Sequence, residues 1–391
     1  MKTLHKLETL LVLFSLGLMT AWANAEGKCG DNVSWKYRTS DKTLVLSGTG
    51  ATSSGSQWSG TSYWADPLLA PTRWSDSIEY VIVENGITQL GNELFLGLRL
   101  AKKVSLPETL TAIGSNVFNG CSSMAEISIP ASVKEIGSFA FYGCKSLKTL
   151  SLPEAVKNIE DGTFSDCGLE EFYVSASIEK IGSFAFMGCA HLTTITVEQG
   201  NANYDSREGC NAVIETATNT LLAGSLRTVI PATVENIGYG AFSSIGIVSI
   251  DIPSSVKKIE EYAFFDCNHL KSINLPESIE AIGDHAFSNC TDLSYFRVEW
   301  KTPLTLVRNT FYRTPLKTLV VPEGCVEAYK AADVWKDFEQ IVTATGIKEG
   351  ALIDSNNIDE IYNLNGVKVS TKSEPLAPGM YIVQGEKVLI K

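Results

Sequence analysis

Short runs of alternating apolar and polar residues recur along the chain, and most of them end at a proline. Residues 147–153 read Leu-Lys-Thr-Leu-Ser-Leu-Pro, and residues 270–276 read Leu-Lys-Ser-Ile-Asn-Leu-Pro. A period of two predicts a strand with one buried face. Proline cannot donate to a ladder, so it marks the end of pairing. An Ile-Gly or Ile-Glu pair follows, as at Ile136-Gly137, and predicts a turn.

A phenylalanine follows each such turn at a nearly constant spacing. The steps between these phenylalanines are 22 to 24 residues, except for one step of 56 residues, which equals two periods and an insertion; the residues are Phe95, Phe118, Phe141, Phe164, Phe186, Phe242, Phe264, Phe287 and Phe311. The segment around each phenylalanine is too short for a full helix, so we expect a single helical or 3₁₀ turn. One such unit cannot bury its apolar face alone. The sequence therefore predicts a solenoid of about 23-residue coils with a parallel β-sheet on one face.

The repeat also resembles a known family. Residues 128–144 read Ser-Ile-Pro-Ala-Ser-Val-Lys-Glu-Ile-Gly-Ser-Phe-Ala-Phe-Tyr-Gly-Cys. This unit is similar to the BspA-like class of leucine-rich repeats of bacterial surface proteins. The resemblance extends over residues 78–342. It implies a leucine-rich-repeat solenoid and a role in adhesion at the cell surface.

The N-terminal residues differ from the repeats. Lys2, His5 and Lys6 precede an apolar run that ends in Ala23-Asn24-Ala25, which is typical of a cleaved signal peptide over residues 1–25. A buried N-terminal helix is the alternative. Residues 26–77 contain two alternating stretches, and we expect a hairpin that caps the first coil. The N-terminal unit of BspA-like proteins is similar.

The repeat is also interrupted near its middle and ends in a different pattern. Residues 196–228 are rich in turn residues and contain a hairpin pattern around Thr218-Asn219, which we expect to project from the solenoid edge. Over residues 325–341, Val326, Tyr329 and Phe338 have helical spacing, so we expect an amphipathic helix that covers the last coil.

A second small β unit follows a linker at residues 343–357. Residues 358–391 contain Asn365-Gly366 between two strand patterns and then a second hairpin pattern that begins at Pro378-Gly379. This tail resembles the C-terminal sorting domain of the type IX secretion system. The resemblance implies transport to the outer surface, and a simple β-cap is the alternative.

The charge and the apolar pattern narrow the range of partners. The formal net charge is −12, which argues against nucleic acid and against an anionic membrane surface. No stretch outside the signal peptide is long and apolar enough for a membrane span. We expect an exported protein, on the outer surface or secreted, that acts as a monomer and has no membrane span.

Nine cysteines in an exported protein raise the question of disulfides. Six occupy one slot, three residues after the phenylalanine: Cys121, Cys144, Cys167, Cys189, Cys267 and Cys290. Leu98, Ile245 and Thr314 fill this slot in other coils, so we interpret it as a buried packing position. Disulfides between coils are the alternative. The pairing of Cys29, Cys210 and Cys325 stays open.

No pattern in the sequence indicates catalysis or a bound cofactor. His191 and His269 lie in equivalent turn positions, and neither has a partner histidine at metal-ligand spacing. No nucleophile elbow, phosphate loop or calcium loop is present. We therefore expect no catalytic residue, no cofactor and no metal.

The outward positions of the strands are the candidate binding surface. They form two columns of mostly small polar residues, in which a few larger side chains stand out: Glu171, Tyr173, Asp251, Asn274, Tyr295 and Arg297. Tyrosine and arginine are favoured in binding hot spots.

We expect a non-enzymatic interaction protein that binds an extracellular protein or glycoprotein through the concave sheet. The alternative is a carbohydrate-binding module in which Trp58 and Trp64 of the N-terminal unit stack on sugars.

Overall fold

The structure is a computed structural model of the whole chain, and it describes residues 24–54 and 77–343 together with four strands of the tail. The chain divides into two compact units. Unit 1 comprises Met1–Leu169 and Ser177–Phe186, and unit 2 comprises Glu170–Ala176 and Met187–Lys391. The predicted signal peptide, residues 1–25, lies outside the described residues except for its last two. Trp58 and Trp64 also lie outside them.

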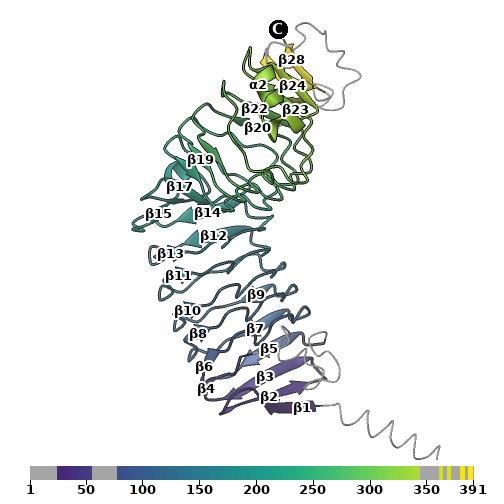
Figure 1. Cartoon of the computed structure of the whole chain (residues 1–391). Helices are drawn as coiled ribbons and strands as arrows, with labels where there is room; N and C mark the ends of the chain where they lie inside the picture. The colour runs from purple at the N-terminus through teal and green to yellow at the C-terminus, as the bar shows by residue number, and fades with distance from the viewer. Residues whose placement is uncertain are drawn as a thin grey trace, which may run out of the picture. The chain divides into compact units, whose positions relative to one another are not determined.

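Unit 1 is a stack of coils with two rows of strands, as Figure 1 shows. The first row is one sheet in the order β1-β2-β3-β5-β7-β9: Asn24–Lys28, Val33–Arg38, Thr43–Gly48, Tyr80–Val83, Lys103–Ser105 and Glu126–Ile127. The expected hairpin is present as the antiparallel pair β2 and β3, and from β3 onward the pairs are parallel. The hairpin therefore supplies the first parallel partner for the coils.

A second row of strands is present in addition to the predicted parallel sheet. It contains β4, β6, β8, β10, β11 and β13: Gly50–Ala51, Ile87–Leu90, Ala112–Ile113, Glu135–Ile136, Asn158–Ile159 and Lys180–Ile181. These strands pair in parallel within two sheets. The predicted turn at Ile136-Gly137 thus begins with a strand. The pattern hides it because most of these strands are only two residues long.

Unit 2 repeats this arrangement. Its first row contains two parallel sheets, β12-β14 and β20-β22-β23-β24: Glu171–Val174, Thr194–Val197, Ser272–Leu275, Tyr295–Val298, Thr318–Val321 and Gln340–Thr343. Its second row is the sheet β15-β16-β17-β18-β19-β21: Tyr204–Asp205, Val213–Glu215, Thr220–Ala223, Asn236–Ile237, Lys258–Ile259 and Ala281–Ile282. An isolated parallel β-bridge between Asp251 and Asn274 pairs the coil before β20 with β20 itself.

The irregular segment at residues 196–228 is part of the stack in unit 2. β16 and β17 form an antiparallel hairpin, and a 3₁₀ turn, η2 (Arg207–Gly209), precedes it. β17 then pairs in parallel with β18. The expectation that this hairpin projects from the edge is therefore wrong, because β17 pairs with the next coil as a regular second-row strand does. The apolar side chains of the hairpin, Val213, Ile214 and Leu221, are completely buried.

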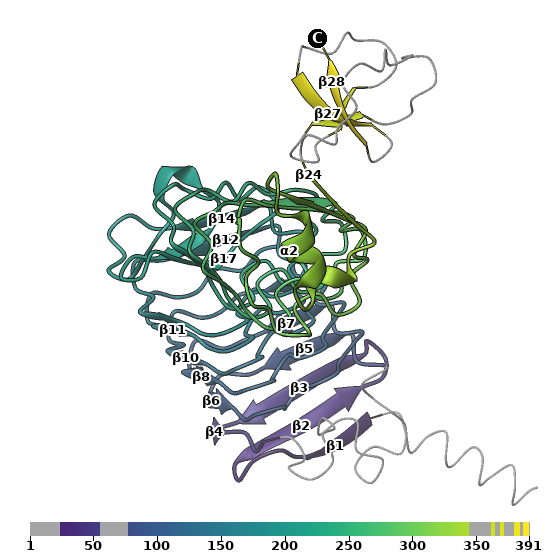
Figure 2. The ribbon, with the colours of Figure 1, turned by 45° about the horizontal axis from the view of Figure 1, so that its top comes forward.

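The last coil of unit 2 is covered by less helix than the pattern predicts. α2 spans Val326–Ala331 and η3 spans Trp335–Asp337, and the chain then enters β24. Figure 2 shows α2 at the end of unit 2. Tyr329 and Trp335 are fully buried, and each donates a hydrogen bond to a backbone carbonyl, at 2.8 Å to Trp300 and 2.7 Å to Leu304.

In the tail, β25 (Ile361–Asn363), β26 (Lys368–Ser370), β27 (Gly379–Val383) and β28 (Glu386–Ile390) form an antiparallel sheet.

The phenylalanines of the repeat, here called the ladder phenylalanines, form the core. In unit 1, the rings of Phe95, Phe118 and Phe141 stack at centroid distances of 5.7 and 5.3 Å. In unit 2, Phe242, Phe264 and Phe287 stack at 5.2 Å each. The segment around each ladder phenylalanine consists of consecutive turns, in which the structure assigns no helix. Left-handed residues such as Asn116 (φ 57°) and Gly120 (φ 74°) interrupt helical geometry there.

Candidate functional site

Four of the six predicted protein-binding residues lie side by side on the first row of unit 2. Asp251 pairs with Asn274, and Asn274 pairs with Arg297 on the next strand, β22. Tyr295 lies two residues before Arg297 and therefore on the same face. We call Asp251, Asn274, Tyr295 and Arg297 the unit 2 strip. The other two, Glu171 and Tyr173, lie on β12 in a separate two-stranded sheet.

The unit 2 strip is less exposed than the sequence predicts. Asp251 is exposed, but Asn274, Tyr295 and Arg297 are half-buried. Burial raises the pKa of Tyr295 to about 12. Side chains in one column stand about 4.8 Å apart across strands, so long side chains cover shorter neighbours. The alternation pattern predicts the face to which a side chain points, but it does not predict how much of that side chain its neighbours bury.

The strip combines charges of both signs with buried polar atoms. The Oδ1 atom of Asn274 is buried, and no described residue hydrogen-bonds to it. An Arg297 Nη2 atom lies 3.7 Å from Glu299 Oε1. A buried acceptor without a donor costs folding free energy. The same column continues to Val320 and Val342, and Val342 is 37% exposed.

Glu171 and Tyr173 are exposed as predicted, and Tyr173 is 54% exposed. Their strand pairs with β14, where Thr194 and Thr196 stand opposite them. An exposed tyrosine beside small threonines offers an accessible ring surface.

The first row of unit 1 carries a smaller hollow of about 460 Å³ on the predicted columns. Lys103 and Glu126 form an ion pair there at 3.1 Å, and both side chains are mostly exposed. Such exposed pairs contribute little to stability. Ser105, Glu108, Ser128 and Thr149 complete its polar lining.

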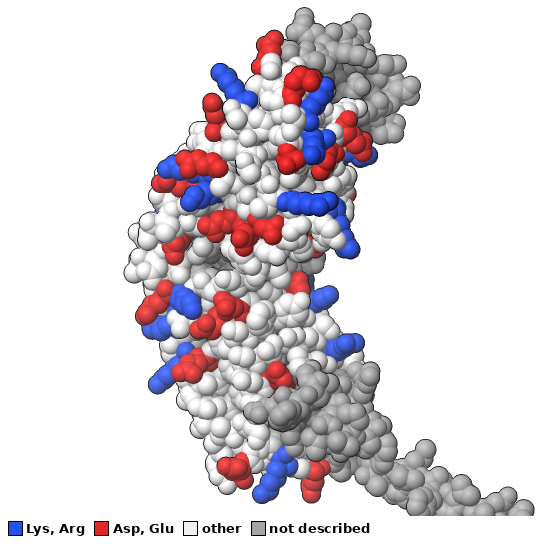
Figure 3. Space-filling model, in the orientation of Figure 1, with Lys and Arg blue, Asp and Glu red and all other residues white. Residues whose placement is uncertain are grey.

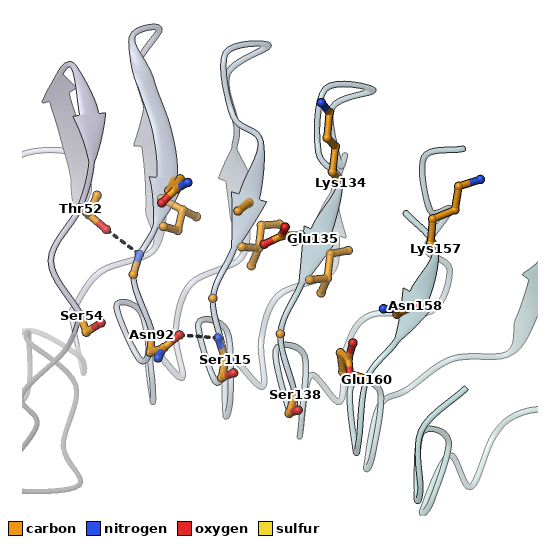
Figure 4. A pocket seen from close by; sticks show the side chains of 18 residues that line it. Thr52, Ser54, Asn92, Ser115, Lys134, Glu135, Ser138, Lys157, Asn158 and Glu160 are labelled. Atoms are coloured by element: carbon orange, nitrogen blue, oxygen red, sulfur yellow. Dashed lines mark hydrogen bonds between the residues drawn. The ribbon is translucent and has the colours of Figure 1, made fainter. Parts of the chain in front are cut away.

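The larger hollow lies on the second row of unit 1, where no candidate binding residue was predicted. It is a groove of about 670 Å³ whose lining includes Asn92, Ser115, Glu135, Ser138 and Asn158. Figure 4 shows Asn92, Ser115 and Ser138 along one side, with Glu135 nearer the middle. The signal that could have located it is the recurrence of polar residues beside each Ile-Gly pair.

The six slot cysteines are core residues, as the slot pattern indicates, and Cys29, Cys210 and Cys325 are buried as well. All nine are buried and none is in a disulfide. Burial raises the pKa of Cys121 and of Cys290 to about 12. Within the described residues, no cluster of histidine, cysteine and acidic side chains could hold a metal ion. In the same part of the chain, no helix is long and apolar enough to cross a membrane.

Charged residues on the surface do not separate into large fields of one sign. On the face seen in Figure 3, acidic and basic side chains lie next to one another, with wide uncharged areas between them. A basic stripe, the electrostatic mark of a nucleic-acid site, is not seen on the described part of this face.

Comparison with known proteins agrees with this architecture. The family model of the BspA type leucine rich repeat region matches residues 73–207 and 225–332. A leucine-rich repeat protein from Eubacterium ventriosum is similar in structure, with a TM-score of 0.64, 21% identity and coverage of 84% of this chain and 87% of that chain. The pneumococcal vaccine antigen PcpA has a TM-score of 0.52 and 18% identity, over 81% of this chain and 99% of that chain.

None of the curated proteins compared with the chain matches it. The two structural likenesses concern the fold. The family match extends over more than half of the chain and includes coils of both units. The chain belongs to the BspA-type leucine-rich-repeat family.

Proposed function

We propose that this chain is an exported, non-catalytic interaction protein that binds an extracellular protein or glycoprotein through the first-row face of its solenoid. The observation that carries the proposal is the unit 2 strip, where Asp251, Asn274 and Arg297 stand in register with Tyr295 beside Arg297. Strand pairing gives these side chains a fixed spacing. A rigid surface loses little conformational entropy when it binds.

The composition of this face suits adhesion to a protein. Arginine and tyrosine are enriched in binding hot spots, and Tyr173 adds an exposed ring on β12. Asp251 and Arg297 provide charges of both signs, which favours a folded protein partner over a uniformly charged polymer. A non-enzymatic role accords with the family, whose repeat solenoids generally serve as binding scaffolds.

Export is supported by the sequence at both ends and by the family. Residues 1–25 have the charge and apolar pattern of a signal peptide, and the tail resembles a type IX sorting domain. β25 to β28 form a small antiparallel sheet in that tail. We propose that the protein reaches the outer surface or is secreted, and that it acts as a monomer.

The test is binding of the full chain to an array of extracellular-matrix and cell-surface proteins. We expect at least one partner, and we expect Arg297→Ala or Tyr173→Ala to weaken that binding by about tenfold or more, as hot-spot truncations do. Lys258→Ala is the matched control, because its column already carries alanine at Ala281. A partner that both variants retain at full strength would contradict the proposed face.

The alternative role, sugar stacking by Trp58 and Trp64, rests on sequence alone because both lie outside the described residues. A glycan array with the full chain and Trp64→Ala separates it from protein binding. Glycan binding that is lost in Trp64→Ala would favour the alternative.

A further inference from the structure

The groove on the second row of unit 1, here called the unit 1 groove, has a structural cause. Gln89, Ala112 and Glu135 pair in register on β6, β8 and β10 and form one column. Ala112 is the short member between two long side chains, so the column has a gap at that coil. The groove of about 670 Å³ runs across this gap from Thr52 to Glu160.

The lining of the unit 1 groove is polar. Its aliphatic members Leu90, Ile113 and Ile136 face the core and are only 2%, 1% and 4% exposed. The wall therefore lacks the aromatic or aliphatic anchors on which protein partners depend. Within the described residues it also has no apolar floor of the kind that holds drug-like ligands.

Several polar groups of the groove are available to a ligand. Within the described residues, the side chains of Gln89, Glu135 and Asn158 make no hydrogen bond or ion pair with protein atoms. Asn92 is held in place because its Oδ1 accepts the backbone N–H of Ser115 at 2.8 Å, which leaves its amide N–H groups as donors. Figure 4 shows this bond and the polar side chains along both sides of the groove.

The charges of the groove balance. Lys134 and Lys157 lie at one rim in Figure 4, and the carboxylates of Glu135 and Glu160 lie below them. Two cations and two anions leave no net field for a polyanion such as a nucleic acid or a sulfated polymer. A ligand rich in neutral donors and acceptors fits amides, hydroxyls and mixed charges best.

We propose that the unit 1 groove binds a neutral oligosaccharide. Hydroxyl groups of the sugar would bond to Gln89, Asn92, Ser138 and Asn158, and the Glu135 carboxylate would accept hydrogen bonds from a pair of neighbouring hydroxyls. The gap at Ala112 gives a sugar ring room to approach the sheet. This site is separate from the unit 2 strip and does not depend on the proposed protein binding.

The test uses titration calorimetry of the full chain with four neutral probes: cellohexaose, xylohexaose, mannohexaose and maltohexaose. We expect at least one to bind, and Ala112→Lys to weaken its binding by about tenfold or more, because the new side chain fills the gap. The fold should tolerate this change, since Lys180 and Lys258 stand at equivalent strand positions. Ala281→Lys is the matched control: its position on β21 corresponds to that of Ala112 on β8, but it does not line the groove.

Glu135→Ala gives a second readout, because Ala112 shows that the column accepts alanine. We expect this variant to lose affinity while its thermal unfolding midpoint stays close to that of the parent. The proposal is overturned if none of the four probes binds, if Ala112→Lys binds as well as Ala281→Lys, or if the chain binds only a sulfated control such as a chondroitin sulfate hexasaccharide.

Discussion

The cysteine slot is more specific than an apolar position. Its thiol donates to the carbonyl of the preceding coil's ladder phenylalanine, at 3.3 Å from Cys121 to Phe95 and at 3.0 Å from Cys267 to Phe242. Thr314 makes the same bond to Phe287. Leu98 and Ile245 occupy this slot in coils whose preceding coil lacks a ladder phenylalanine. Burial of this slot was predictable from the sequence, but the donor role was not, because hydrogen-bond partners are set by coil stacking.

Thr314→Val tests the donor role. Valine has the same shape, but it removes the hydroxyl that donates to the Phe287 carbonyl and accepts the Cys290 N–H at 3.1 Å. Both backbone groups would then lack that partner in a buried place, so we expect a loss of about 1–3 kcal/mol in unfolding free energy. Thr314→Cys keeps a donor and should lose less. Denaturant unfolding compares the two, and equal losses would argue for simple packing.

At the scale of elements, the first-row strands could be predicted because alternation over several residues is a strong signal. The second row could not, since two-residue strands such as β8 and β10 are shorter than the window in which a period can be recognised. The unit 1 groove lies on that second row, and it was missed for the same reason. The shortened cap has a local cause: after Ala331 the backbone of Ala332 is extended and Val334 has a positive φ of 69°, so α2 cannot continue.

The coil made by the irregular segment has a glycine where a ladder phenylalanine would stand. Gly224 donates to the Ala241 carbonyl as Phe242 does to that of Ala263, so it occupies the ladder position. A Cβ atom at Gly224 would lie 2.1 Å from the Phe242 ring. We expect Gly224→Ala to destabilise unit 2 by about 1–3 kcal/mol, the usual effect of overpacking.

Gly246→Ala is the matched control for Gly224→Ala, because the nearest atoms to its added methyl lie at 3.6 Å. Thermal unfolding of both variants measures the difference. If the two midpoints fall equally, contact between the added methyl group and the Phe242 ring is not the cause of the loss.

An ion-pair cluster links the hairpin to the first coils of unit 1. Glu79, just before β5, accepts hydrogen bonds from Lys42, before β3, and from Lys102, before β7, at 2.5 and 2.6 Å. These bonds lower the pKa of Glu79 from 4.5 to about 2. A lowered folded-state pKa means that its stabilisation is present above about pH 4.5 and is lost as the pH falls toward 2.

Glu79→Gln should remove that part of the acid dependence. We expect the thermal midpoint of the parent to fall more steeply than that of the variant between pH 4.5 and 2, and we expect the two curves to converge at the acid end. Glu126→Gln is the control, because its pair with Lys103 is mostly exposed. Parallel curves for parent and Glu79→Gln would show that the cluster does not link the hairpin to the coils.

At the scale of the molecule, the repeat explains why the fold was accessible from sequence and the ligand was not. Core positions recur in every coil, so the residues at equivalent positions of the other coils support the assignment of each one to the core. The residues that differ between coils are the ones available for binding, and a single sequence gives each of them only once. Asp251, Asn274 and Arg297 were recognisable as large polar residues, but their contact depends on the strand register.

The loss of stability caused by a core substitution should stay close to the substituted coil, because in a solenoid each coil contacts mainly its neighbours. Phe118 is fully buried and stacks on Phe95 and Phe141. Phe118→Ala should cost about 3–5 kcal/mol locally. We expect amide hydrogen exchange, followed by mass spectrometry, to speed up in the coils around β8 and β10 of unit 1. Exchange in the unit 2 coils that carry Phe264 and Phe287 should stay unchanged.

Phe264→Ala is the reciprocal variant, and it should speed exchange around β19 and β21 while it leaves β8 and β10 protected. Its ring contacts are matched, since Phe264 stacks on Phe242 and Phe287 at 5.2 Å each. Each variant thus serves as the control for the other. If either substitution accelerates exchange evenly through both units, unfolding is cooperative over the whole stack. The effect of a substitution at the unit 2 strip on binding could then not be separated from the stability of unit 1.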